Sequence, residues 1–148
     1  MGAKNFGGDE VLYGYEESKI IIIPVPYDAT STYIKGADKG PQAILDASPA
    51  LEFYDIETNG EAHLIGIHTI EPLVSGPDPE EVTSKVYKTV SGVLREGRFP
   101  VVIGGNHTVS VGAFMAASEI FPDLTILQLD AHSDLRPVYE GSPLNHAC

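Results

Sequence analysis

Residues 20–25 read Ile-Ile-Ile-Ile-Pro-Val, a run in which almost every side chain is β-branched. A strand with one wet face alternates apolar and polar residues, whereas this run is apolar on both faces. It therefore predicts a central strand of a parallel sheet that helices cover on both sides. Because Pro24 has no N–H to donate to a ladder, we expect the strand to end there.

Strand-like and helix-like segments alternate along the rest of the chain, after a polar, glycine-rich stretch over residues 1–18 that we expect to be a loop. This alternation predicts one α/β domain with a parallel sheet between helices. We expect helices at 40–47, from 78 to a stop at Gly97, and at 109–120, and further strands at 64–68, 99–103 and 124–129.

The helix that begins after residue 78 has the clearest local signals. Asp78 can cap the helix, Pro79 suits its first position, and Glu81 has the spacing of a capping box. Apolar residues then recur at helical spacing and form one face. Gly97 is a typical stop just beyond the last turn.

The net charge limits the partners of the chain. Its 148 residues carry 21 acidic and 9 basic side chains, a formal net charge of −12. Such a surface repels phosphate backbones, so we expect no nucleic acid partner, and it attracts cationic small molecules. Solubility alone is the alternative explanation of the charge.

Membrane and secretory signals are not found. No apolar run approaches the roughly 20 residues that a membrane span needs. The polar N-terminus has no apolar segment typical of a secretory signal. The chain has one cysteine, Cys148, so no internal disulfide is possible. These features fit a cytoplasmic protein without a membrane partner.

Candidate metal ligands follow two of the expected strands. The apolar run 124–129 stops at Asp130, and His132 and Asp134 follow at every second position. In an extended chain these three side chains point to one side, beyond the strand end where open α/β sheets bind ligands. Gly104-Gly105-Asn106-His107 follows the strand at 99–103, and right-handed crossovers place both strand ends on one edge. His107 can then reach the same point.

Two imidazoles with carboxylates suit Mn²⁺, Fe²⁺, Co²⁺ or Zn²⁺, and the lack of thiolates argues against a structural zinc site. Asp130, nearest the sheet, is the natural bridging ligand if there are two ions. The alternative is that the aspartates satisfy turns and that His132 lies on the surface. His63 and His68 have no acidic partner at ligand spacing, and we interpret them as structural or surface residues.

These motifs resemble the ureohydrolase family, which contains arginases and agmatinases. The segment from Asp134 to Ala147 looks like the agmatinase branch, whereas arginases have a different, slightly longer stretch that holds the α-amino and carboxylate groups. The resemblance runs from about Ile20 to the last residue. The matching segments are Gly104-Gly-Asn-His-Thr108, Asp130-Ala-His-Ser-Asp134, Pro24-Val-Pro-Tyr-Asp28, and Gly36 with Gly40-Pro-Gln-Ala-Ile44.

The resemblance implies a three-layer α/β/α sandwich with two Mn²⁺ ions bridged by hydroxide. By motif match, His107, Asp130 and Asp134 would bind one ion, and Asp130 and His132 the other. His146 matches the histidine that serves the family in proton transfer. The hydroxide would attack the guanidinium carbon of a cationic guanidino substrate and release urea and an amine. With agmatine the amine is putrescine, which implies a role in polyamine biosynthesis. The family usually assembles from several identical subunits, so we expect a homo-oligomer.

The sequence departs from the family pattern in two ways. The residue before the metal-binding histidine is often aspartate in the family and is Asn106 here, which keeps an acceptor but loses a charge. The family also has a later Asp-x-Asp motif that supplies ligands to both ions, and the resemblance ends before it. We therefore expect residues 1–148 to be the N-terminal part of a single, truncated ureohydrolase domain. The second ion would keep only Asp130 and His132.

Several hypotheses stay open on these grounds. The chain is the N-terminal half of an agmatinase-like enzyme, a non-catalytic or split half-domain that needs a partner chain, or a sequence cut short of its natural end. The substrate is agmatine, or else arginine, guanidinobutyrate or a similar compound. No substrate-binding residue is identified, because the loops that would read the substrate's tail lie largely beyond residue 148.

Overall fold

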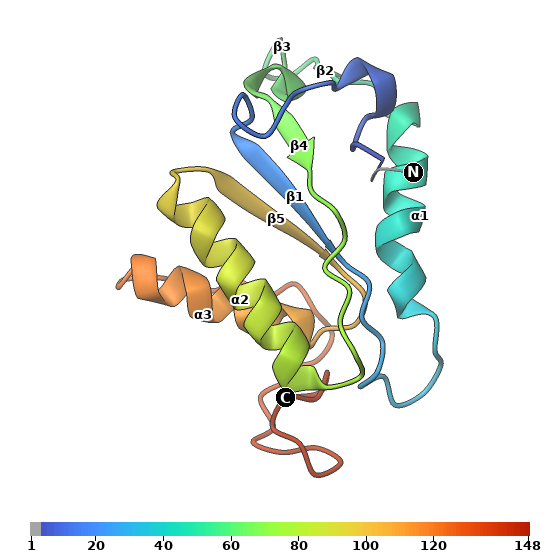
Figure 1. Cartoon of the computed structure of the whole chain (residues 1–148), viewed down its shortest axis with the longest axis vertical. Coiled ribbons are helices and arrows are strands. Elements are labelled where there is room, and N and C mark those ends of the chain that lie inside the picture. The colour runs from blue at the N-terminus through green and yellow to red at the C-terminus, as the bar shows by residue number, and fades with distance from the viewer. Residues whose placement is uncertain (1–3) are drawn as a thin grey trace.

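The computed structural model describes residues 4–148, so the first three residues of the expected N-terminal loop lie outside it. At its centre is a parallel sheet in the order β4 (Ile67–Thr69), β1 (Ile20–Val25) and β5 (Phe99–Gly104). The residue at the start of β1 is paired with Ile67 on one side and Phe99 on the other. The predicted central parallel strand is confirmed, and it ends at Val25, one residue later than expected (Figure 1).

Helices cover both faces of this sheet. Figure 1 shows α1 (Gly40–Ala47) on one face, and α2 (Pro79–Arg95) on the other with α3 (Val109–Ile120) packed against it. The expected three-layer α/β/α arrangement is therefore present. A small antiparallel pair, β2 (Tyr54–Asp55) and β3 (Gly60–Glu61), was not predicted.

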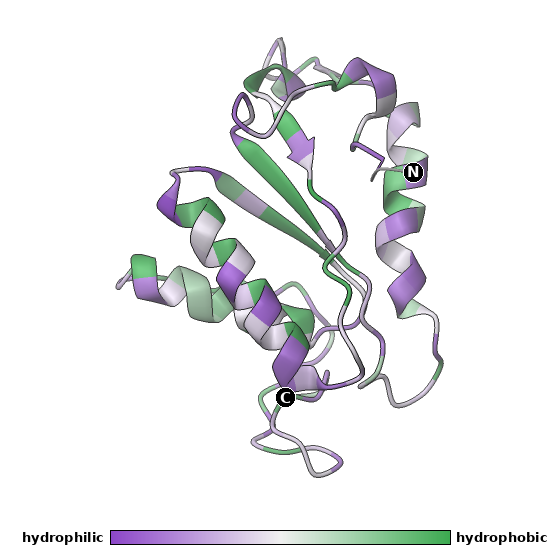
Figure 2. Ribbon diagram, viewed as in Figure 1, coloured by the Kyte–Doolittle hydropathy of each residue, from purple (hydrophilic) through white to green (hydrophobic). Residues whose placement is uncertain are grey.

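Alternate side chains of β1 point into two separate cores, as the all-apolar run requires. Figure 2 shows the hydrophobic colour along this strand. The core on the α2 side consists of Ile21, Ile23, Val25, Tyr27, Val82, Val86, Val90, Val93, Val109 and Ala116. The core on the α1 side consists of Val11, Ile22, Leu45 and Ile67.

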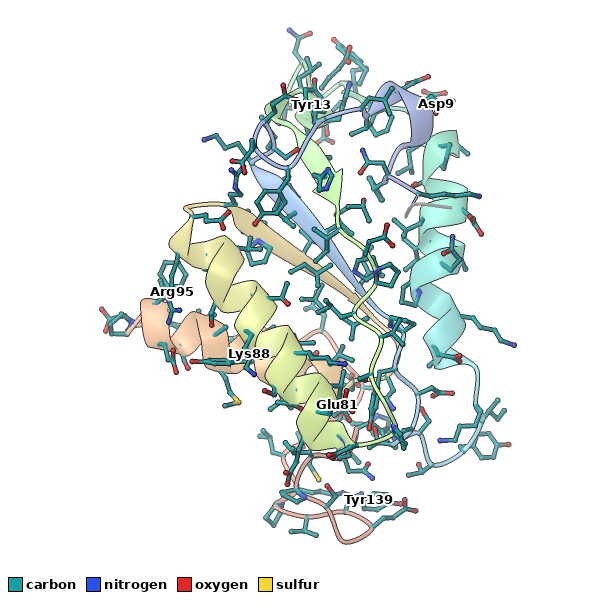
Figure 3. The ribbon with its side chains drawn as sticks, in the orientation of Figure 1. Asp9, Tyr13, Glu81, Lys88, Arg95 and Tyr139 are labelled. Carbon is teal, nitrogen blue, oxygen red and sulfur yellow. The ribbon has the colours of Figure 1, made fainter. Side chains whose placement is uncertain are left out.

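The ends of α2 follow the local signals with one correction. Asp78 caps the helix by accepting a hydrogen bond from the Glu80 N–H at 3.0 Å, and Gly97 adopts a φ of 71° just beyond the C-terminus. Glu81 does not complete a capping box. Its carboxylate accepts from the Gly76 N–H at 3.2 Å and pairs with Lys85 at 2.7 Å, one turn along the helix. Figure 3 labels Glu81 at the start of α2 and Arg95 at its end.

The strand expected at 64–68 begins later in the structure. Residues 62–65 form a 3₁₀ turn, and β4 starts at Ile67. Gly66 separates the two with a φ of 85°, a conformation that side chains disfavour. A Cβ here would lie 2.8 Å from the backbone of Glu17 and Ser18, so the close approach also requires glycine.

The prediction of a strand at 124–129 is wrong for this structure. The segment joins no ladder among the described residues, and its side chains are exposed, with Leu127 at 83% and Leu129 at 90%. A strand exists only when a neighbour accepts its backbone hydrogen bonds. The outer edge of β5 is also unpaired within residues 4–148. Within that range, no helix combines the length and apolar character of a membrane span.

Candidate metal centre

The turn after β5 positions His107. The Gly105 N–H donates to the Val25 carbonyl at 2.9 Å, and the Asn106 N–H donates to the Tyr27 carbonyl at 2.8 Å. These bonds hold the turn against the loop that follows the neighbouring strand. A Cβ on Gly105 would collide with the Tyr27 carbonyl, so glycine is needed for this approach. His107 stands two residues before the start of α3, at the carboxyl edge of the sheet.

The stretch from Asp130 to Asp134 reaches the same edge by a route that was not expected. Residues 130–132 form bends, and the stretch contains no strand. The His132 N–H donates to Asp130 Oδ1 at 2.9 Å, and Asp134 has a φ of 46°. That backbone hydrogen bond, aided by the nearby His107 imidazole, lowers the pKa of Asp130 and favours its ionised form.

Three of the four proposed metal ligands lie together. One nitrogen of His107 and one oxygen each of Asp130 and Asp134 are all within 4.8 Å of one another. His132 is set apart from this group. Its side chain is 79% exposed, and its Nδ1 atom lies 3.6 Å from Asp130 Oδ1. The two aspartates lie together as predicted, but the extended chain on which that prediction relied is absent, and His132 does not join them.

The grouped atoms suit a divalent cation. Two carboxylates and one imidazole are the donors that Mn²⁺ and similar ions take, and both carboxylates come without a Lys or Arg partner among the ion pairs of residues 4–148. Asp130 also lies beside His132, whose Nδ1 atom is 3.6 Å from Asp130 Oδ1. The donor set thus fits one ion at His107, Asp130 and Asp134, and it offers part of a second site.

His146 lines the same cavity as the metal group. This cavity has a volume of about 590 Å³, and its lining includes all five predicted site residues. The Nδ1 atom of His146 lies 2.6 Å from the Thr30 carbonyl, and its Nε2 atom lies 3.4 Å from Thr32 Oγ1. The loop after β1, the turn after β5 and the C-terminal loop therefore all contribute to one site.

Sequence reasoning did not identify the remaining lining residues. Arg136 and Tyr139 line the cavity, and the Arg136 guanidinium lies 4.9 Å from the centre of the Tyr139 ring. Figure 3 labels Tyr139 in the C-terminal loop. Both belong to the segment that looks agmatinase-like, but neither has a spacing that indicates a role. Thr30, whose carbonyl contacts His146, was also missed, because every residue type has a carbonyl.

A second, larger groove of about 830 Å³ lies between β5 and α3 and has a mainly apolar lining. It contains His107 from the metal group, at one end of β5. The titratable residues that carry the chemistry line the smaller cavity, so we place the site there. The apolar groove instead lies along β5, whose outer edge is unpaired within residues 4–148.

His63 and His68 are structural, as expected from their spacing. His63 is buried against the Phe53 ring, with 4.5 Å between the ring centres. His68 Nδ1 lies 3.0 Å from the Tyr13 carbonyl. Neither lines the cavity that contains the metal group.

Several known proteins are similar to this chain in sequence and in fold. The chain is 38% identical to an N(1)-aminopropylagmatine ureohydrolase of Synechocystis sp. over 99% of its own length and 50% of the relative's. Among solved structures, it superimposes on the agmatine ureohydrolase of Thermoplasma volcanium with a TM-score of 0.90 and 32% identity, covering 100% of this chain and 49% of that one. It also superimposes on a Trypanosoma cruzi formiminoglutamase with Mn²⁺, with a TM-score of 0.82 and 28% identity, covering 92% and 47%.

The chain thus spans about half the length of the relatives it matches. The family model described as the arginase family matches residues 18–148, which include the sheet, the three α-helices and every residue of the candidate site. The chain belongs to the arginase family.

Proposed function

We propose that this chain is the N-terminal half of a manganese-dependent ureohydrolase that converts agmatine, or its N(1)-aminopropyl derivative, to urea and a polyamine. The observation that carries the proposal is the meeting of His107, Asp130 and Asp134 at the carboxyl edge of the sheet, in a cavity that His146 also lines. The names of the related ureohydrolases support the substrate class.

The residues of this half have separable tasks in the proposed reaction. His107, Asp130 and Asp134 would hold one Mn²⁺ ion, and Asp130 with His132 would hold part of the second. Bound Mn²⁺ supplies a water activated for attack on the guanidinium carbon. His146 would carry a proton between the cavity and the departing amine. The remaining ligands would come from the half of the family fold that lies beyond residue 148.

The charge of the chain supports a cationic substrate. A net charge of −12 raises the local concentration of a guanidinium or ammonium compound near an acidic cavity. Arg136 is the one lysine or arginine among the residues that line the cavity, and its guanidinium lies 4.9 Å from the centre of the Tyr139 ring, where a cation–π interaction can hold it. We propose a cytoplasmic homo-oligomer that acts in polyamine biosynthesis, as the family resemblance implies.

The test is urea release in the presence of Mn²⁺, by residues 1–148 alone and by the same residues joined to the C-terminal half of the Synechocystis sp. relative. We expect the joined protein to release urea from agmatine or N(1)-aminopropylagmatine. Asp134→Asn should abolish that activity, and Asp123→Asn, which removes the same charge from an exposed turn, should not. Turnover only of arginine or guanidinobutyrate would overturn the substrate assignment.

A second function is favoured by the exposed segment 124–129. Its leucines and the unpaired edge of β5 are what a half-domain would present to a separate partner chain. Gel filtration with metal analysis distinguishes this case. A monomer that binds no Mn²⁺ and gains metal binding only with the complementary half would be a split enzyme.

A further inference from the structure

His146 is held by a network that starts at the turn after β5. Asn106 is almost fully buried, and its Nδ2 atom lies 2.8 Å from Thr30 Oγ1. Thr30 Oγ1 lies 2.8 Å from Thr108 Oγ1, which in turn lies 3.4 Å from the Leu144 carbonyl. The network therefore joins the loop after β1 to the chain just before His146.

One set of donors and acceptors satisfies every hydrogen bond in this network. The Thr108 N–H can only donate, and it meets Asn106 Oδ1 at 3.2 Å, so the Asn106 NH₂ must face Thr30. Thr30 Oγ1 accepts from that NH₂ and is free to donate to Thr108 Oγ1. Thr108 then donates to the Leu144 carbonyl, which can only accept. Along this path each donor therefore meets an acceptor, and Asn106 Nδ2 has a second, more distant acceptor in Ser31 Oγ at 3.2 Å.

The backbone of the same loop is also fixed. The Lys35 ammonium donates to the carbonyls of Asp28, Ala29 and Ser31, at 2.8, 3.0 and 2.8 Å. The carbonyl of Thr30, between them, points instead to His146. The loop thus presents a single carbonyl to the imidazole while its neighbours are satisfied elsewhere.

This carbonyl decides which nitrogen of His146 carries the proton. A carbonyl oxygen only accepts, so Nδ1 at 2.6 Å must be protonated. In the neutral ring, Nε2 then has the lone pair, and the Thr32 hydroxyl at 3.4 Å can only donate to it. The ring nitrogen nearer to Thr32, a residue of the cavity lining, is therefore the basic one.

We propose that Thr30 is a positioning residue for His146: its carbonyl fixes the Nδ1–H tautomer, and its hydroxyl, between Asn106 and Thr108, holds that carbonyl in place. The proposal rests on the proposed function, because a basic Nε2 matters only if His146 handles protons. It extends that function by naming the residues that prepare this histidine before any substrate or metal binds.

The test is nuclear magnetic resonance of the ¹⁵N-labelled 148-residue chain, which reads the protonation of each imidazole nitrogen without any activity. Spectra are taken well above the ordinary histidine pKa of about 6.5, so that the rings are neutral. A His146→Gln spectrum assigns the signals among the five histidines. We expect His146 to show only the Nδ1–H tautomer. Thr30→Val should convert it to a mixture of both tautomers, and Thr30→Ser, which keeps the hydroxyl, should restore the single form.

Two matched variants act as controls. Ser31→Ala removes the more distant acceptor of the Asn106 amide, at 3.2 Å, and Thr32→Val removes the hydroxyl beside Nε2. Both should keep the Nδ1–H tautomer. An Nε2–H tautomer in the unaltered chain overturns the inference, and that result stands even if Thr30→Val fails to fold. A folded Thr30→Val chain with an unchanged tautomer also overturns it. Neither result bears on whether the complete enzyme hydrolyses agmatine, so the two proposals fail separately.

Discussion

The Nε2 atom of His107 lies 3.8 Å from Oδ2 of Asp134, although His107 follows β5 and Asp134 ends a loop that pairs with no strand of the described chain. His107 is 38% exposed and Asp134 is 20% exposed, so both remain accessible from the cavity. The turn after β5 and the bends that begin at residue 130 bring these two side chains together. The expected strand at 124–129 is not needed for this contact.

Loss of Asp134 should weaken Mn²⁺ binding more than loss of an equal charge elsewhere. Asp134→Asn removes one of three clustered donors, and we expect affinity to fall by more than about tenfold, since even residues that only support ligands cost that much. Isothermal titration of the chain with MnCl₂ measures the change. Asp123→Asn is the control, and equal losses in both variants would indicate general electrostatic attraction in place of a site.

Asp28 should make the stability of the chain fall in acid. The Ser31 hydroxyl, then the Gly36 N–H at 2.6 Å, donate to its carboxylate and lower its pKa in the folded state. A lowered folded pKa stabilises the protein above the unfolded value of about 3.9, and this contribution is lost as the pH falls through the folded pKa.

Carboxyl-carbon titration by nuclear magnetic resonance should therefore find Asp28 below its usual range. Ser31→Ala should raise the Asp28 pKa toward that range, because it removes the largest cause of the shift. Asp28→Asn should reduce the loss of unfolding free energy in acid, as measured by urea unfolding at several pH values. An Asp28 pKa at its ordinary value in the unaltered chain would contradict the prediction.

Gly105 should tolerate no side chain. A Cβ there would meet the Tyr27 carbonyl, so Gly105→Ala must push apart the two loops that carry the site, at a cost of roughly 1–3 kcal/mol of unfolding free energy. Gly92→Ala is the matched control. Gly92 lies within α2 with nothing within 4 Å, and alanine there should stabilise by about 0.5–1 kcal/mol. Urea denaturation measures both, and equal effects would contradict the close approach.

Features that the sequence predicted well depend on local signals or on burial along one element. α2 begins directly after Asp78 and ends before Gly97 because these residue types favour a helix cap and a left-handed backbone, respectively. The central position of residues 20–25 follows from apolar side chains on both faces. The candidate ligands were found because carboxylates and imidazoles are recognisable residue types.

Features that the sequence did not predict depend on which groups pair through backbone hydrogen bonds. Residues 124–129 have the composition of a buried strand, but pairing requires a neighbour that sequence periodicity does not identify. The His132 side chain does not point with the two aspartates as predicted, because the His132 N–H donates to Asp130 and the chain bends there. Thr30 supports His146 through a carbonyl, and no residue type reveals which carbonyl will be used.

The exposed leucines of 124–129 should matter for association and hardly at all for the stability of the isolated chain. Leu127 is 83% exposed, so Leu127→Glu should change its unfolding free energy by no more than about 0.5 kcal/mol. The same charge should block pairing if this segment becomes a buried strand once the complementary half is present, because an unpaired charge is costly in a core. Leu12→Glu is the control, since Leu12 is 73% exposed and lies in the N-terminal loop before β1.

Gel filtration of each variant with the C-terminal half of the Synechocystis sp. relative measures assembly. We expect the Leu12 variant to assemble and the Leu127 variant to remain apart, whereas equal assembly would mean that residues 124–129 stay exposed in the complete fold.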